Sequence, residues 1–207
     1  MKKAAGLVFL LAFFLGLWSG ALDEQHSEAL PEKLLRLRVV AADDSEAAQA
    51  RKLLARDTAL QVLLPLLEGC DSLASAEQAV ASALPATAEA VALALGETGE
   101  APPLTLTLGP AACPLRSYED FTLPAGTYET LTVTLGAGEG RNWWCVVFPP
   151  LCLAAAEGET EENDSWAVFS PGERSMMTAE GRELRFRVLE IFQYLRDLFR
   201  SKKEPSI

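Results

Sequence analysis

The side chains that could carry chemistry in this 207-residue chain are four cysteines and a single histidine. Cys145 and Cys152 have six residues between them, which is neither the spacing of a CxxC redox pair nor that of a zinc site. His26 stands in a polar stretch near the N-terminus, where no motif makes it the base of a Cys–His pair. The acidic residues form no motif of paired carboxylates. The sequence therefore predicts no catalytic site, no metal site and no cofactor, and a thiol-dependent enzyme is a hypothesis of lower rank.

The N-terminus has the pattern of an export signal. Lys2 and Lys3 precede an apolar run over 4–22, and the small residues Ser19 and Ala21 favour cleavage after Ala21. The alternative is an uncleaved membrane anchor, since the run is almost long enough to span a bilayer. We therefore expect an extracytoplasmic protein that is either secreted or membrane-anchored, with residues 1–22 as signal peptide or anchor.

Export changes how the cysteines are interpreted, because thiols outside the cytoplasm can persist as disulfides. The four cysteines allow three pairings, of which Cys145 with Cys152 is the most local, and Pro149-Pro150 could turn the chain between them. Cys70 with Cys113 is a second pairing. The alternative is reduced, buried cysteines that pack as small hydrophobic residues.

Hydrophobic patterns over residues 34–153 predict a domain of four strands and two helices. Strict alternation of apolar and polar residues marks the strands, and apolar residues at helical spacing mark the helices. Ser75 and Gln78 have capping-box spacing, and Pro85 should interrupt the helix that they open. The expected elements are a strand at 35–39, helices at 46–64 and 75–95, and strands at 104–108, 130–135 and 142–148.

This order predicts an α+β fold, a two-layer sandwich in which two helices cover one face of a mixed or antiparallel four-stranded sheet, in the order βααβββ. The open face of the sheet would carry Arg36, Arg38 and rows of threonines. The glycine-rich loop 136–140 joins two strands and leads to no helix N-terminus. We therefore interpret it as a hairpin loop rather than a phosphate cradle.

The strand at 142–148 differs from its neighbours because both of its faces are apolar. Alternation places Trp143 and Cys145 on one face, and Trp144 and Phe148 on the other. Aromatic side chains supply much of the energy of protein interfaces. We predict a partner-binding surface here, with core packing of the tryptophans as the alternative; its residues are Arg141, Asn142, Trp143, Trp144 and Phe148.

The remaining segments flank this domain. Residues 23–33 are predicted to be a polar tether, 154–177 an acidic linker and 204–207 a tail. Residues 178–203 are predicted to form an amphipathic helix with a basic polar side. It could pack on its own domain, lie on an anionic membrane surface or bind a partner helix. The net charge of −11 argues against nucleic acid as a partner.

Two blocks of the sequence resemble the stage II sporulation protein R family of endospore-forming bacteria. The more specific block comprises 123–129 (LPAGTYE), 136–140 and 142–152 (NWWCVVFPPLC). The other comprises 37–41, Asp44, Ser45, Gln49, Lys52, Arg56 and Asp57. The resemblance covers about residues 34–153.

The resemblance implies a signalling protein that performs no chemistry itself. Proteins of this family are made in the forespore and exported into the intermembrane space between forespore and mother cell. There they trigger a membrane-embedded aspartic protease of the mother cell, which leads to processing of the sigma-E precursor. An envelope-anchored structural or binding module without a signalling role is the alternative.

Overall fold

The computed structural model describes residues 29–99, 101–118, 121–151 and 166–178. The chain divides into two compact units. The larger unit consists of Pro31–Cys113 and Gly126–Val168, and the smaller one of Met1–Leu30, Pro114–Ala125 and Phe169–Ile207. The predicted signal segment, the first half of the acidic linker and the predicted helix beyond Thr178 lie outside the described residues.

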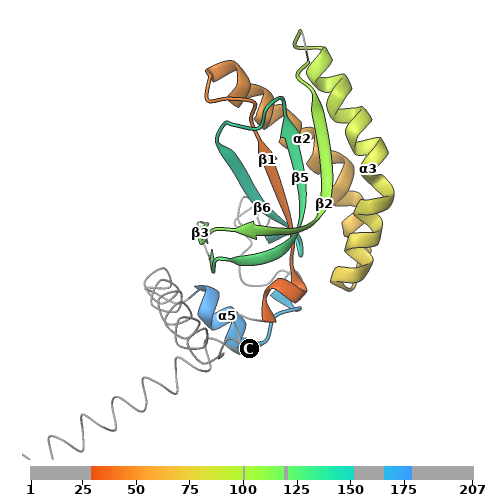
Figure 1. Cartoon of the computed structure of the whole chain (residues 1–207). Helices are drawn as coiled ribbons and strands as arrows, with labels where there is room; N and C mark the ends of the chain where they lie inside the picture. Colours follow the sequence, from red (N-terminus) through yellow and green to blue (C-terminus); the bar gives the residue numbers. More distant parts are fainter. Residues whose placement is uncertain (1–28, 100, 119–120, 152–165, 179–207) are drawn as a thin grey trace, which may run out of the picture. The chain divides into compact units, whose positions relative to one another are not determined.

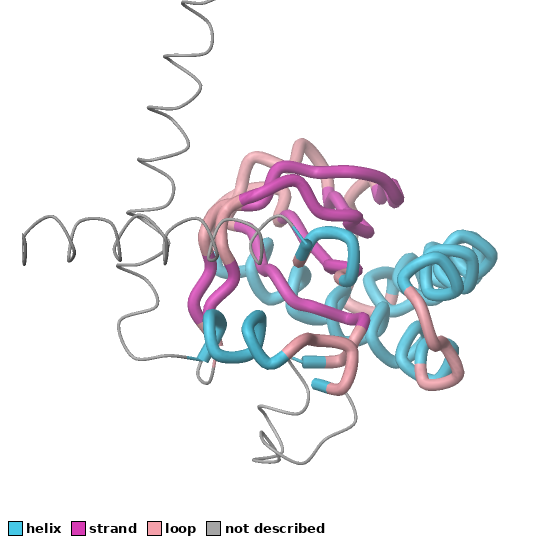
Figure 2. The backbone as a smooth tube through the Cα atoms, turned by 90° about the horizontal axis from the view of Figure 1, so that it is seen from below, coloured by secondary structure: helices cyan, strands magenta, loops and turns pink. Residues whose placement is uncertain are grey.

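The larger unit is an α+β sandwich, as the sequence predicts. Helices α2 and α3 lie against one face of a four-stranded sheet (Figure 1), and Figure 2 shows helices and strands in the view from below. The strand order across the sheet is β2-β5-β1-β6. The elements of this unit are η1 (Pro31–Lys33), β1 (Leu35–Val40), α2 (Glu46–Leu67), α3 (Leu73–Gly96), β2 (Leu104–Cys113), β5 (Gly126–Leu135) and β6 (Asn142–Phe148).

Strand β1 lies in the middle of a mixed sheet. It runs parallel to β5 and antiparallel to β6, so β5 and β6 are consecutive in this unit but are not neighbours. The predicted hairpin at 136–140 is therefore wrong, because the loop must pass the end of β1. Backbone hydrogen bonds from Glu139 to Ala42 (3.2 Å) and from Gly140 to Ala41 (3.0 Å) tie the loop to the chain that leaves β1.

The core lies between the helices and the sheet. Alternate residues of the strands face the helices, so each strand contributes one apolar row. Burying each such side chain fully stabilises the fold by about 1.5–3 kcal/mol. The central strands contribute Leu35, Leu37, Val39, Leu131, Val133 and Leu135 to this core.

Helix α2 begins after an N-cap residue, Ser45. The Ser45 hydroxyl accepts a hydrogen bond from the Ala48 backbone N–H (3.2 Å), as expected for a serine at this position. Not all leucines of this helix face the core, because Leu53 is 41% exposed. Small residues let the helix approach the sheet closely instead; the buried residues are Ala48, Lys52, Ala55, Ala59, Leu63 and Leu67.

Helix α3 is continuous through Pro85, so the predicted interruption is wrong. The proline ring is on the exposed side, where the loss of one backbone hydrogen bond is compensated by solvent. The helix also starts earlier than predicted, because its capping box is formed by Ser72 and Ser75 rather than by Ser75 and Gln78. Packing of its inner face outweighs the local preference of proline.

Among the residues that the structure describes, α3 is, by length and composition alone, a helix that could cross a membrane. Its inner side chains Val80, Ala83, Val91 and Leu95 are part of the hydrophobic core. Core helices of folded domains pass the same test, and 28% of the apolar window of α3 is buried inside the structure.

The described part of the smaller unit contains the short strands β3 (Arg116–Ser117) and β4 (Thr122–Leu123) and helix α5 (Pro171–Thr178). β3 and β4 pair antiparallel, and the rings of Tyr118 and Phe121 stack at 4.5 Å between them in the chain. Helix α5 falls in the stretch that we expected to be an acidic linker, so that part of the stretch is helical.

Candidate functional site: the polar–aromatic end of the sheet

Two loops far apart in the sequence meet where β1 ends and β6 begins. The backbone N–H of Arg141 donates a hydrogen bond to Asp44 Oδ1 (2.8 Å), and Arg141 Nε lies 3.3 Å from the same oxygen. Both side chains are largely exposed, so their ion pair adds at most about 1 kcal/mol. The backbone hydrogen bond matters more here, because it fixes the start of β6 against the turn before α2.

The turn before α2 is held by its own hydrogen bonds. Asp43 Oδ1 accepts from the Ser45 backbone N–H (2.8 Å), and hydrogen bonds from Ser45 lower the pKa of Asp43. Gln49 Nε2 donates to the Asp43 carbonyl (2.9 Å) and to Asp44 Oδ1 (3.3 Å). The first turn of the helix is therefore bonded to the turn that precedes it.

Lys52 connects this helix to the loop before β6. Its ammonium group donates to Gln49 Oε1 (2.5 Å) and to the Arg141 carbonyl (3.3 Å). The residue is only 7% exposed. Burial lowers the pKa of Lys52, the positive charge of Arg141 lowers it further, and Asp44 opposes the shift. The hydrogen bond to the loop before β6 therefore explains why a lysine lies on the inner face of this helix.

Arginines surround Trp144 on the open face of the sheet. The guanidinium carbons of Arg36 and Arg38 each lie 5.1 Å from the centroid of its ring. Arg36 lies at the same distance from the ring of Tyr128 and is fully buried. Arg38 Nε and Nη2 both donate to Asn142 Oδ1, at 3.3 Å and 3.2 Å. Each cation–π contact contributes about 0.5–2 kcal/mol, so the ring and the guanidinium groups hold one another in place.

Trp143 points to the helix side of the sheet. The guanidinium carbon of Arg56 in α2 lies 5.1 Å from its ring, and Arg56 Nε is 2.6 Å from Asp57 Oδ1. Trp143 is half-buried and packs against the core. We call this whole region the polar–aromatic end; its residues are Arg38, Asp44, Gln49, Lys52, Arg56, Arg141, Asn142, Trp143 and Trp144.

The structure brings together four of the five residues of the predicted partner-binding surface. Arg141 and Asn142 are exposed, Trp143 is half-buried and Trp144 is 8% exposed. Phe148 belongs to the hydrophobic core at the other end of β6. The register shifts between Leu35 and Arg36, so that Phe148 lies opposite Leu35 and joins the helix-facing row, against the predicted alternation.

Most of the polar residues that join the two loops were singled out in the sequence only because they belong to a block that resembles the family. No local pattern links Asp44, Gln49 or Lys52 to β6, because the contacts are made across the fold. One signal was present: Lys52 stands four residues after Ala48, in the stripe that a helix turns inward.

The predicted Cys145–Cys152 bridge stays a prediction, because only Cys145, which is 1% exposed in the core, is among the described residues. Its Sγ lies 3.4 Å from the Val146 carbonyl oxygen, to which it donates. Cys152 lies outside the described residues. Cys70 and Cys113 are thiols, so the second pairing is not formed. Cys145 belongs to the hydrophobic core of the larger unit.

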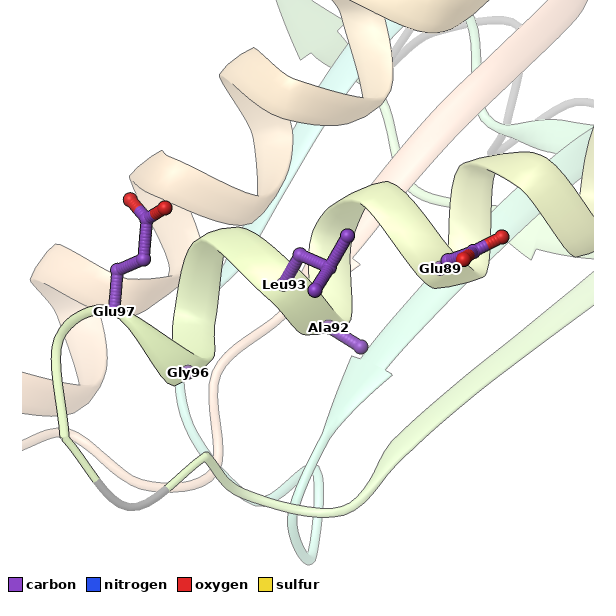
Figure 3. A pocket seen from close by; sticks show the side chains of 5 residues that line it. All are labelled: Glu89, Ala92, Leu93, Gly96 and Glu97. Carbon is purple, nitrogen blue, oxygen red and sulfur yellow. The ribbon is translucent and has the colours of Figure 1, made fainter.

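No catalytic set assembles in the described part of the chain. Within it, no group of three or more histidine, cysteine, aspartate or glutamate residues could hold a metal ion. A shallow pocket lies at the C-terminal turns of α3 (Figure 3), and its lining side chains offer two carboxylates but no nucleophile beside a base. The residues that line it are Glu89, Ala92, Leu93, Gly96 and Glu97.

The fold and the site together define a small α+β domain with a hydrogen-bonded, polar and aromatic surface at one end of its sheet. A sequence model of the family described as stage II sporulation protein R (spore_II_R) matches residues 31–158, and the chain belongs to this family. The chain is 28% identical over 229 residues to stage II sporulation protein R of Bacillus subtilis (strain 168), covering 96% of this chain and 100% of that relative. No solved structure matches the chain. Membership of this family gives the protein a role in sporulation, and the name of the family describes no enzyme.

Proposed function

We propose that this protein is a secreted sporulation signal that activates a membrane-embedded aspartic protease of the mother cell. It would act from the intermembrane space and lead to processing of the sigma-E precursor. The observation that carries this proposal is the meeting of the two family-like blocks. Arg38 of one block and Asn142 of the other stand 104 positions apart in the sequence, yet two nitrogens of Arg38 donate hydrogen bonds to Asn142 Oδ1. Both blocks thus contribute to one surface.

The form of this surface suits binding more than chemistry. The loops are joined by hydrogen bonds before any partner arrives, which reduces the entropy lost on association. Exposed arginine and asparagine side chains stand beside a half-buried tryptophan, a composition typical of interface centres. A ligand that binds the active state of the protease better than its inactive state would shift the protease towards activity.

Reconstitution in a bacterium that does not form spores tests the proposal. The full chain, the protease and the sigma-E precursor are produced together, and precursor cleavage is followed by immunoblot. Cleavage should require the chain and should fall at least tenfold with Trp143→Ala or Arg141→Ala, each shown to be folded by circular dichroism. Leu93→Ala is the matched control, because Leu93 is 66% exposed on α3 and stands outside the polar–aromatic end.

Two results would contradict the proposal: precursor cleavage that proceeds equally without the chain, and full cleavage with both folded variants. Binding of the chain to anionic membranes, without activation of the protease, would instead favour an envelope-anchored module. Sedimentation of the full chain with anionic vesicles, compared with a chain that stops at residue 156, measures that binding. It also tests the prediction that residues 178–203 contact a membrane surface.

A further inference from the structure

The open face of the sheet carries no acidic side chain among the described strand residues. Its charged residues are Arg36 and Arg38 of β1, although the whole chain has a net charge of −11. The half of this face towards Asn142 is only partly accessible, since Asn142 is exposed and Arg38 half-buried, whereas Trp144 and Val40 are buried; the half around Arg36 is buried. The other polar residues of this face are Thr105, Thr107, Thr130, Thr132, Thr134 and Asn142.

Hydrogen-bond donors dominate the accessible half of this face. Asn142 Oδ1 accepts from two nitrogens of Arg38, so its carbonyl oxygen is occupied and its NH₂ group remains as a donor. Arg38 is half-buried, and its Nη1 makes no hydrogen bond to any described residue. A guanidinium group has no acceptor atom, so the pair offers only donors to a ligand.

Trp144 adds a third donor. Its indole Nε1–H is buried, and none of the residues that the structure describes accepts a hydrogen bond from it. Leaving such a donor without an acceptor costs about 1–3 kcal/mol, and native proteins rarely do so without a reason. The guanidinium carbon of Arg38 lies 5.1 Å from the centroid of the same indole ring.

We propose that Trp144, Arg38 and Asn142 form a binding site for the carboxylate side chain of a glutamate or aspartate on the partner protein. A carboxylate has two acceptor oxygens and no donor, which matches a site that has donors only. Its charge would be attracted by Arg38 on a face without acids, whereas the acidic remainder of the chain would repel it. The identity of the partner rests on the proposed function, but the chemistry of the site does not.

Nuclear magnetic resonance of the ¹⁵N-labelled full chain tests the site directly, because the indole N–H of each tryptophan gives its own signal. The probe is a blocked tripeptide with a central glutamate, and the neutral control is the same tripeptide with glutamine. We expect the Trp144 indole signal to move downfield and to saturate with the glutamate peptide, while that of Trp166 stays in place. Trp144→Phe, which removes the N–H and keeps an aromatic ring, assigns the signal by deleting it.

Three results would overturn the site. One is an equal shift with the glutamine peptide, and another is no shift beyond that caused by sodium chloride at the same ionic strength. The third is a shift only with a blocked dipeptide that ends in a free carboxylate, since that would mean recognition of a chain terminus rather than a side chain. The binding measurements themselves use the unaltered chain, and Trp144→Phe serves only to assign the signal.

A charge variant gives a second readout. Arg38→Gln should weaken binding of the glutamate peptide at least tenfold and lower precursor cleavage. Arg51→Gln removes the same charge from α2 and should change neither. If wild-type chain binds the peptide but triggers no cleavage, the proposed function fails and the site stands. If it triggers cleavage but binds no carboxylate, the site fails and the function stands.

Discussion

Replacing Gly140 by alanine would push apart the two loops that build the polar–aromatic end. A Cβ at this position would lie 2.6 Å from the carbonyl carbon of Asp43 and 3.0 Å from Ala41 Cβ, and would clash with the Asp43 carbonyl oxygen. Ordinary contact begins at 3.4 Å, so the difference from 2.6 Å requires the backbone to move by about 0.8 Å. Two backbone atoms cannot move aside as a flexible side chain would.

The cost has two parts. Overpacking of this kind destabilises a protein by about 1–3 kcal/mol. The displaced loop also strains the hydrogen bonds from Gly140 to Ala41 and from Glu139 to Ala42, each with a net contribution of about 1 kcal/mol. With partial loss of these bonds we expect about 2–4 kcal/mol in all, which lowers the melting temperature of a chain of this size by roughly 4–16 °C.

Thermal unfolding followed by circular dichroism measures this effect, and two variants serve as controls. Gly69→Ala places its Cβ where nothing lies within 4 Å, so it should leave the melting temperature almost unchanged. Val91→Ala deletes two buried methyl groups in α3 and should cost about 2 kcal/mol away from the site. Only Gly140→Ala should also reduce precursor cleavage at a temperature where all three variants are folded.

An unchanged melting temperature for Gly140→Ala would refute the reasoning, because it would mean that the two loops are not in close contact. Equal loss of cleavage in Gly140→Ala and Val91→Ala would show that stability alone matters, and not the geometry of the polar–aromatic end.

Three further predictions concern stability and its dependence on pH. Burial lowers the pKa of Lys52, so the unfolded chain keeps this proton to higher pH than the folded chain does. The free energy of unfolding of the wild type, relative to that of Lys52→Gln, should therefore rise as the pH approaches 10.5. Urea unfolding of both proteins at about pH 7 and about pH 10 measures this difference. Burial, with repulsion from Glu77, raises the pKa of Glu129. Glu129→Gln should therefore stabilise the protein well above pH 4.5 and have little effect below it. A difference in urea midpoint between variant and wild type that does not change with pH would contradict this. Ser45→Ala removes the N-cap of α2 and should cost about 1 kcal/mol. Ser72→Ala should cost a similar amount at α3, but only the change at Ser45 should lower cleavage, since that cap borders the polar–aromatic end.

Local patterns were sufficient for the elements and the fold class. Alternation of leucine with threonine or arginine marks a strand with one apolar face wherever it occurs, and Ser45 marks a helix start because its hydroxyl can satisfy a backbone N–H of the first turn. The prediction that Pro85 interrupts the helix is wrong because the effect of a proline is not set by local sequence alone. Its effect on a helix depends on whether the ring faces solvent and on how much the rest of the helix buries.

The site was predicted only in part. The sequence indicated the start of β6, because Arg141, Asn142 and two tryptophans stand together there. It could not show that Phe148 would turn into the core, since a register shift opposite Leu35 leaves no mark in an apolar run. Nor could it show that Cys145 would lie in the core, because its neighbours in space belong to other strands and helices.

The sequence by itself determined the α+β class, the order of the main elements, an aromatic strand that differs from its neighbours, and the family. These properties rest on interactions between residues close in the chain, or on residue types alone. Only the tertiary structure decided that β1 lies between β5 and β6. That placement makes loop 136–140 pass the end of β1, and it brings Arg38 to Trp144 and Lys52 to Arg141. Contacts across about a hundred residues are set by which strands pair, and pairing is settled by the packing of the whole core.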